Sequence, residues 1–219
     1  MIVESKIEKE QFLEYWNNEE SIVIPIWEDL ERHPMTCDVS FLYVRFKNLD
    51  FVLPFNHNDC EPIEIDLSES KQTKWIWNKK ALLQTDLKIQ NQKDIQTSLF
   101  FNENKLYPFG EKLEALTNFY HRLGMRDGLG KSIPIMKFME VLGNISDDFG
   151  NLKPTIDWID DTMIPILSDV ERLGIRVDRE KFFDKWKDNK KSLWFSRAFT
   201  EYNPYTITSR PSNRHLGIN

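Results

Sequence analysis

The sequence of 219 residues contains little cysteine and no long hydrophobic run. Cys37 and Cys60 could form one disulfide, but without a secretion signal two reduced thiols are the better interpretation. The first residues, MIVESKIEKEQ, lack the basic-then-apolar order of a secretory leader. No stretch of eighteen apolar residues is present to span a membrane. We therefore expect a cytoplasmic protein with no membrane partner.

Several common signatures of catalysis and cofactor binding are also missing. The sequence has no P-loop, GxGxxG, HExxH or GxSxG pattern, and two cysteines cannot form a zinc knuckle. Its four histidines, His33, His57, His121 and His215, are too dispersed to indicate a metal site. We therefore predict no metal-binding residues and no cofactor in this chain.

The residues that are present indicate a globular chain with an uneven distribution of charge. Hydrophobic residues make up 40% of the sequence and aromatic residues 13%, enough for a packed core. Residues 1–70 carry a net charge of −11, whereas residues 176–219 carry +5. Phosphate contacts dominate nucleic-acid affinity, so a polyanion would be repelled by the first third and attracted by the end. The same distribution of charge would arise if the acidic and basic residues only formed solvated surfaces, without a nucleic-acid partner.

The pattern of the first half predicts a helix followed by strands. Ser5 and Glu8 form a capping box that opens a helix through about Asn17, with its apolar positions at Ile7, Phe12, Tyr15 and Trp16. Strands are expected at 21–27, 39–46 and 51–55, and a further strand at 73–77. The short turn between the second and third strands predicts an antiparallel hairpin.

The pattern becomes helical after about residue 79. Helices are expected near 113–123, 135–142, 156–173 and 179–193, the last one capped by Asp178. In the third helix Pro165 should cause a kink, and the expected inward face is formed by Ile159, Met163, Ile166, Leu167 and Val170. The segment 143–154, rich in Gly, Asn, Asp and Pro, is the best candidate for a domain boundary.

Two segments of the second half resemble motifs of one enzyme family. Ile164–Asp178, IPILSDVERLGIRVD, resembles the helix that opens the polymerase domain of family A DNA polymerases; Gly174 would end the helix in a left-handed cap. Tyr202–Asn219, YNPYTITSRPSNRHLGIN, resembles the first palm motif of these enzymes, in a divergent, phage-type form with Ser209 in place of a glycine. The resemblance implies DNA contacts at Thr206, Thr208, Ser209, Arg210, Ser212 and Asn213, because hydroxyl and guanidinium groups suit phosphate and sugar oxygens.

The resemblance also gives the N-terminal half an expected identity. Family A polymerases commonly carry a 3′–5′ exonuclease domain before the polymerase domain, and FVLPFNH resembles its third strand, while Asp94 to Thr97 resemble a later helix start. The fold class that this implies is α/β: a ribonuclease-H-like sheet domain in residues 1–150, then helices leading into the start of a polymerase palm in residues 151–219.

An active exonuclease of this type needs carboxylates on its first strand to bind two metal ions. Here the first strand holds Pro25 and Trp27 at the corresponding positions, and Asp38 or Asp94 could each supply one ligand at most. We therefore expect no catalytic residues in this chain. The fewer than thirty residues between Asp178 and Thr206 also leave no room for the long thumb of familiar members.

The resulting hypothesis is the N-terminal part of a phage-like DNA-directed DNA polymerase, with primer–template DNA as partner. A second polypeptide could carry the rest of the palm and fingers, and Mg²⁺ would be expected in the complete enzyme; the compartment would then be the host cytoplasm. The segment from about residue 200 should be poorly anchored in this chain alone. A non-catalytic replication accessory protein is one alternative, and an active exonuclease with relocated acids is another.

Overall fold

A five-stranded mixed sheet forms the centre of the computed structural model, which describes residues 1–27, 38–47, 49–56, 60–103, 112–113, 132–133, 153–176, 178, 193–194, 197–205 and 211–213. The strands lie in the order β3-β2-β1-β4-β5. β1 pairs antiparallel with β2 and β2 antiparallel with β3, whereas β4 is parallel to β1 and β5 is parallel to β4. The strands span Ser21–Trp27 (β1), Val39–Arg45 (β2), Asp50–Pro54 (β3), Lys74–Ile76 (β4) and Gln92–Asp94 (β5). The predicted strands and the antiparallel hairpin are confirmed.

The first helix, α1 (Lys6–Asn18), begins where the capping box predicts. Glu8 N donates to Ser5 Oγ at 3.3 Å, and Ser5 N donates to a Glu8 carboxylate oxygen at 2.8 Å, which satisfies two backbone donors of the first turn. Phe12 and Trp16 are fully buried against the sheet. Ile7, which the sequence predicts on the same apolar face, lies in the first turn of α1 and is 77% exposed.

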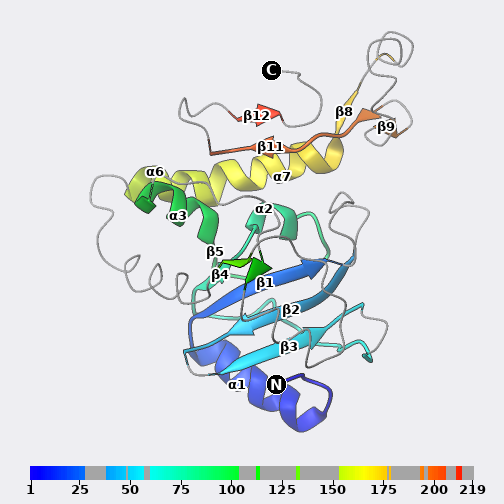
Figure 1. Cartoon of the computed structure of the whole chain (residues 1–219), viewed down its shortest axis with the longest axis vertical. Coiled ribbons are helices and arrows are strands. Elements are labelled where there is room, and N and C mark those ends of the chain that lie inside the picture. The colour runs from blue at the N-terminus through cyan, green and yellow to red at the C-terminus, as the bar shows by residue number, and fades with distance from the viewer. Residues whose placement is uncertain are drawn as a thin grey trace.

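The main core lies between α1 and the sheet. Phe12 packs edge-on against Phe51, with ring centroids 5.3 Å apart, and Phe46 contacts both rings. β1 is apolar at six of its seven positions, and Ser21–Ile26 are all buried, as is typical of a central strand covered on both faces. In Figure 1 the sheet lies between α1 at the bottom and a group of helices at the top.

A buried lysine joins α1 to the parallel half of the sheet. Lys74 of β4 has no exposed surface, and its Nζ donates to the carbonyls of Trp16 (2.6 Å) and Glu19 (2.8 Å) at the end of α1. The ammonium also lies 4.3 Å from the centre of the Trp16 ring. Burial lowers the pKa of Lys74 to about 8, partly opposed by the charges of Glu20 and Glu19. The lysine therefore supplies the last turn of α1 with the donors that its carbonyls need.

The helices at the top of Figure 1 follow β4, β5 and the boundary region. α2 (Lys79–Leu82) follows β4 and α3 (Ile95–Glu103) follows β5. A long helix comes next, in three parts: α6 (Lys153–Trp158), a π-helical turn (Ile159–Met163) and α7 (Ile164–Leu173). We refer to these three parts together as the lead-in helix. It packs against α2, α3 and β5.

The lead-in helix differs from its prediction in two ways. The sequence predicts a kink at Pro165, but the regular α-helical hydrogen bonding is interrupted earlier, by a π turn in which Ile164 N donates to Ile159 O. The face expected inward is only partly buried: Leu167 is buried and Ile159 and Met163 are half-buried, whereas Ile166 is 55% exposed and Val170 37%. The buried face instead includes Asp160 and Glu171, which are accommodated because each is paired with a lysine.

Gly174 ends the lead-in helix, as predicted, with a different geometry. Its φ of 65° is the conformation that glycine permits, but its ψ of 170° is extended and not left-handed helical. The chain then enters β8 (Ile175–Arg176), which pairs with β10 (Arg197–Ala198), and β10 pairs with β9 (Leu193–Trp194). The Arg197 guanidinium donates to the carbonyls of Leu173 and Gly174, each at 2.9 Å.

Other short elements complete the described fold. β6 (Lys112–Leu113) pairs with β7 (Ser132–Ile133), and β11 (Tyr202–Asn203) pairs with β12 (Ser212–Asn213). The helices predicted near 113–123, 135–142 and 179–193 lie outside the described residues, except that Leu113 and Leu193 belong to strands. No helix in the described ranges is long and apolar enough to cross a membrane.

Candidate functional site

The most unusual feature of the structure is a set of buried charges where the ends of β4 and β5 meet the lead-in helix. Asn78, with a positive φ of 59°, turns the chain out of β4, and its side chain accepts from Ala81 N. The tight turn directs Lys79 and Lys80 toward the lead-in helix, although only 5% and 6% of their surfaces are exposed. Buried lysines require carboxylate or carbonyl partners.

Lys79 is paired with Asp160 of the π turn. Its Nζ donates to an Asp160 carboxylate oxygen and to the Asp160 carbonyl, both at 2.9 Å, and to the Gln92 carbonyl at 3.1 Å. Both oxygens of the Asp160 carboxylate also accept from Asp94 N at 3.1 Å. Burial raises the pKa of Asp160 to about 6, although the charge of Lys79 acts in the opposite direction.

Lys80 is paired with Glu171, the glutamate of the ERLGI motif. The Lys80 Nζ lies 2.5 Å from Glu171 Oε1 and also donates to the Tyr202 carbonyl. The same carboxylate accepts from Tyr202 N at 2.6 Å and from Gln84 Nε2 at 2.6 Å. Burial raises the pKa of Glu171, with Lys80 opposing the effect. This second pair therefore joins α2, α7 and β11 at one point.

Lys93 extends the cluster to the surface. Its Nζ lies 2.9 Å from a carboxylate oxygen of Asp161 and 3.4 Å from one of Asp157. Burial tends to lower the pKa of Lys93, but the hydrogen bond to Asp161 and the surrounding acids raise it overall. α6 begins at Lys153, so both aspartates lie beyond its first residues, and they pair with lysines.

Asp94 is a second centre of hydrogen bonds, and it is 1% exposed. One carboxylate oxygen accepts from Lys79 N at 3.0 Å, and the other accepts from Thr97 N at 2.8 Å and from the Tyr205 hydroxyl. Asp94 therefore caps α3, which confirms the expected helix start. Burial raises the pKa of Tyr205 well above its ordinary value, and the Asp94 charge adds to this effect.

The acids considered as metal ligands do not converge. Asp38 precedes β2, is exposed and accepts from Asn56 Nδ2 at 3.3 Å. Asp94 ends β5, three strands away in the sheet order, a separation of roughly 14 Å at ordinary strand spacing. Between them in the sheet lie β1 and β4. Among the described residues no group of three or more metal-ligating side chains is present. These residues do not fit a two-metal exonuclease site.

The predicted DNA-contact residues are only partly described. Thr206, Thr208, Ser209 and Arg210 lie outside the described residues, whereas Ser212 and Asn213 form β12 and pair with β11. The expectation of a poorly anchored segment from about residue 200 is wrong for residues 202–205. Tyr205 is 7% exposed, and the Tyr202 backbone is bonded to Lys80 and Glu171. Buried polar partners on the sheet domain hold this segment.

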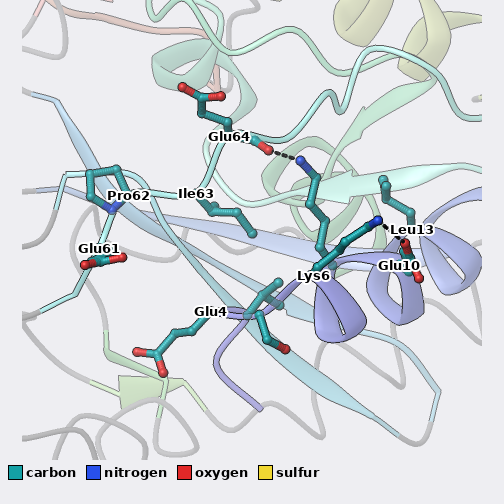
Figure 2. A pocket seen from close by; sticks show the side chains of 11 residues that line it. Glu4, Lys6, Glu10, Leu13, Glu61, Pro62, Ile63 and Glu64 are labelled. Carbon is teal, nitrogen blue, oxygen red and sulfur yellow. Dashed lines mark hydrogen bonds and ion pairs between the residues drawn. The ribbon is translucent and has the colours of Figure 1, made fainter.

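A shallow hollow lies at the opposite end of the molecule, between the start of α1 and residues 61–64 (Figure 2). Lys6 lies 3.8 Å from a carboxylate oxygen of Glu10, and Lys9 donates to the Glu64 carbonyl. Both cations are therefore engaged, while Glu4 and the carboxylate of Glu64 are exposed at the rim. This acidic surface would repel a polyanion, in agreement with the charge of the first third of the sequence.

Sequence reasoning missed the two buried ion pairs. The consecutive lysines 79 and 80 directly after an apolar strand were the available signal, because solvated charges rarely interrupt a buried region. Their partners are 81 and 91 residues away in the sequence, and no local pattern identifies them. No protein-family model matches this sequence, and no curated protein matches it.

Proposed function

We propose that this chain is the N-terminal part of a family A DNA polymerase, in which an inactive exonuclease-like sheet domain acts as a scaffold and the segment after Tyr205 contacts primer–template DNA. The order of the sheet supports the first half of this proposal. β2 and β3 continue the sheet antiparallel on one side of β1, and β4 and β5 continue it parallel on the other, a mixed α/β sheet that is compatible with the proposed ribonuclease-H-like domain.

The observation that carries the proposal is the position of Glu171. This residue belongs to the motif that resembles the opening of a family A polymerase domain, and it is buried in contact with Lys80 of the sheet domain. A lead-in helix of a polymerase must hold the palm in a defined position relative to the domain before it. The buried pair gives the glutamate of the motif this physical role, and Gly174 allows the turn that follows.

The described residues at the ends of the strands are the reason why we expect no exonuclease chemistry. Metal ions that activate water for phosphodiester cleavage need several carboxylates close together. β1 supplies none, and the two buried acids near the end of β4, Asp160 and Glu171, are each already paired with a lysine. We expect the chain to release no 3′ nucleotides with Mg²⁺ or Mn²⁺. Metal-dependent release that is abolished by Asp38→Asn or Asp94→Asn would support the active-exonuclease alternative instead.

The direct test of the proposal is complementation. The chain would be mixed with a polypeptide that carries the two-aspartate palm and the fingers of a phage-type family A enzyme, with Mg²⁺ and a labelled primer–template. Primer extension by the mixture, and by neither component alone, is the expected result. A matched control uses the Glu171→Leu variant, which should assemble poorly because its lead-in helix is no longer fixed to the sheet.

A replication accessory protein remains a second candidate, and one observation favours it. The segment 202–205 is held by contacts within its own chain: Tyr202 is bonded to Lys80 and Glu171, and Tyr205 to Asp94. An accessory protein would bind DNA or a replication protein with no gain of primer extension in the mixture. Complementation therefore separates the two candidates.

A further inference from the structure

The segment that carries the proposed DNA contacts begins at residues with defined contacts, the paired strands β11 and β12 together with Tyr205, which we call its base. Tyr202 lies opposite Asn213 and Asn203 opposite Ser212 in the pairing of β11 with β12, so residues 204–211 connect two paired strands. Asn203 also closes the start of this connection: its Oδ1 accepts from Tyr205 N at 3.1 Å and its Nδ2 donates to the Tyr205 carbonyl at 3.2 Å. Both ends of the connection are therefore held side by side.

Tyr205 attaches this base to the sheet domain. Its ring lies beside that of Phe100, with centroids 5.7 Å apart, and its hydroxyl donates to Asp94 and lies 3.1 Å from Thr97 Oγ1. The acceptor is itself fixed, because the Asp94 carboxylate also accepts from Lys79 N and Thr97 N. The hydroxyl thus meets a carboxylate whose orientation is set by α2 and α3.

We propose that Tyr205 is a positioning residue for DNA binding: its hydroxyl bond to Asp94 fixes the start of the connection on the sheet domain, so that the residues from Thr206 onward meet DNA from a fixed origin. This inference rests on the proposed DNA-contact function. The physical reason is entropic, because a connection held at its base loses less conformational freedom when it binds.

The hydroxyl is the part of Tyr205 that separates positioning from packing. Tyr205→Phe keeps the ring in its buried place and removes the bond to the Asp94 carboxylate, and bonds to charged acceptors are stronger than neutral ones. Tyr202 offers a matched control, because its hydroxyl forms no hydrogen bond with any described residue, although its backbone is bonded to Lys80 and Glu171. Tyr202→Phe therefore removes the same atom without loosening the base.

The test compares the full-length chain with these two variants. Affinity for a fluorescent primer–template is measured by anisotropy at several salt concentrations, and hydrogen exchange follows the amides of Tyr202, Asn203, Ser212 and Asn213. Tyr205→Phe should weaken binding about tenfold and speed exchange at these amides, with exchange in α1 unchanged. The dependence of affinity on salt should stay the same, because no phosphate contact is removed. Tyr202→Phe should behave as wild type.

The outcomes distinguish this inference from the proposed function. If the wild-type chain binds no primer–template, the proposed function is overturned, and the positioning role with it. If the wild type binds and Tyr205→Phe binds equally well, or if Tyr202→Phe loses as much affinity, only the positioning role is overturned. Should Tyr205→Phe fail to fold, Asp94→Asn replaces the charged acceptor of the Tyr205 hydroxyl with a neutral amide of the same shape; a loss of affinity of about threefold is then expected, and no loss refutes the role.

Discussion

The pair formed by Lys80 and Glu171 allows a quantitative test of how the lead-in helix is held. Glu171→Leu would leave the Lys80 ammonium with the Tyr202 carbonyl and with the more distant Glu201 carboxylate, 4.0 Å away, and would remove the acceptor of Gln84 Nε2 and of Tyr202 N. Breaking a buried pair by removing one partner costs about 3–5 kcal/mol. We expect Glu171→Leu to lower the free energy of unfolding by this amount.

Two further variants separate charge from hydrogen bonding. In Glu171→Gln the new amide keeps the shape, and Gln84 can turn its own amide, because its Oε1 has no hydrogen-bond partner among the described residues. The hydrogen bonds can then be kept and mainly the charge is lost, so a cost of about 1–3 kcal/mol is expected. The double variant Lys80→Met with Glu171→Leu removes both charges and should lie within about 1 kcal/mol of wild type.

Urea unfolding followed by circular dichroism gives the free energies of wild type, of these three variants and of Lys80→Met alone on one scale. The reasoning requires strong coupling: the double variant must be more stable than Glu171→Leu alone. If Glu171→Leu costs less than about 1 kcal/mol, or if the two single costs simply add in the double variant, the pair does not fasten the lead-in helix.

Three further predictions concern other charges. The pKa of Asp160 is raised to about 6, so the stability that its proton contributes is present below the ordinary pKa of 3.8 and is lost as the pH rises through 6. The free energy of unfolding of wild type, relative to Asp160→Asn, should therefore fall by about 3 kcal/mol between pH 3.8 and 7. An equal dependence on pH in the two proteins would contradict this. The pKa of Lys74 is lowered to about 8, so the free energy of unfolding of wild type, relative to Lys74→Met, should rise by about 3 kcal/mol between pH 8 and 10.5. If the difference in free energy between the two proteins does not change with pH, Lys74 does not titrate in the folded protein. Arg210→Ala should weaken DNA binding, measured by anisotropy, more than Lys187→Ala does, because Arg210 belongs to the proposed motif and Lys187 only to the expected basic helix 179–193. Equal losses of affinity would argue against the palm-like motif.

The parts of the fold that follow from local rules could be predicted from the sequence. Ser5 and Glu8 specify the start of α1 within three residues, and the run SIVIPIW specifies a buried strand through its composition alone. Asp94 could be recognised as a helix start because a capping aspartate bonds to a backbone amide three residues later. In each case the interacting groups are neighbours in the sequence.

The candidate site could not be predicted in this way, because its groups meet only through tertiary structure. Apolar spacing predicts Ile166 and Val170 to be buried, yet both are exposed, and the buried face combines Leu167 with the paired acids Asp160 and Glu171. Periodicity identifies a face that can be buried, but it does not identify a face that is buried through ion pairs. Tyr205 belongs to the segment that the sequence predicts to be poorly anchored, because its acceptor Asp94 lies 111 residues earlier and no local pattern connects the two.

The distance in sequence between the buried lysines and their partners has a consequence for folding during synthesis. The ribosome releases Lys79 and Lys80 first, and the acids that neutralise them follow 81 and 91 residues later. At roughly 5–20 residues per second, this interval is on the order of 4–18 s. During that time α2 cannot close over its lysines without burying unpaired cations. The emerging chain must therefore keep the end of β4 hydrated, while α1 and the strands already released can begin to form their core.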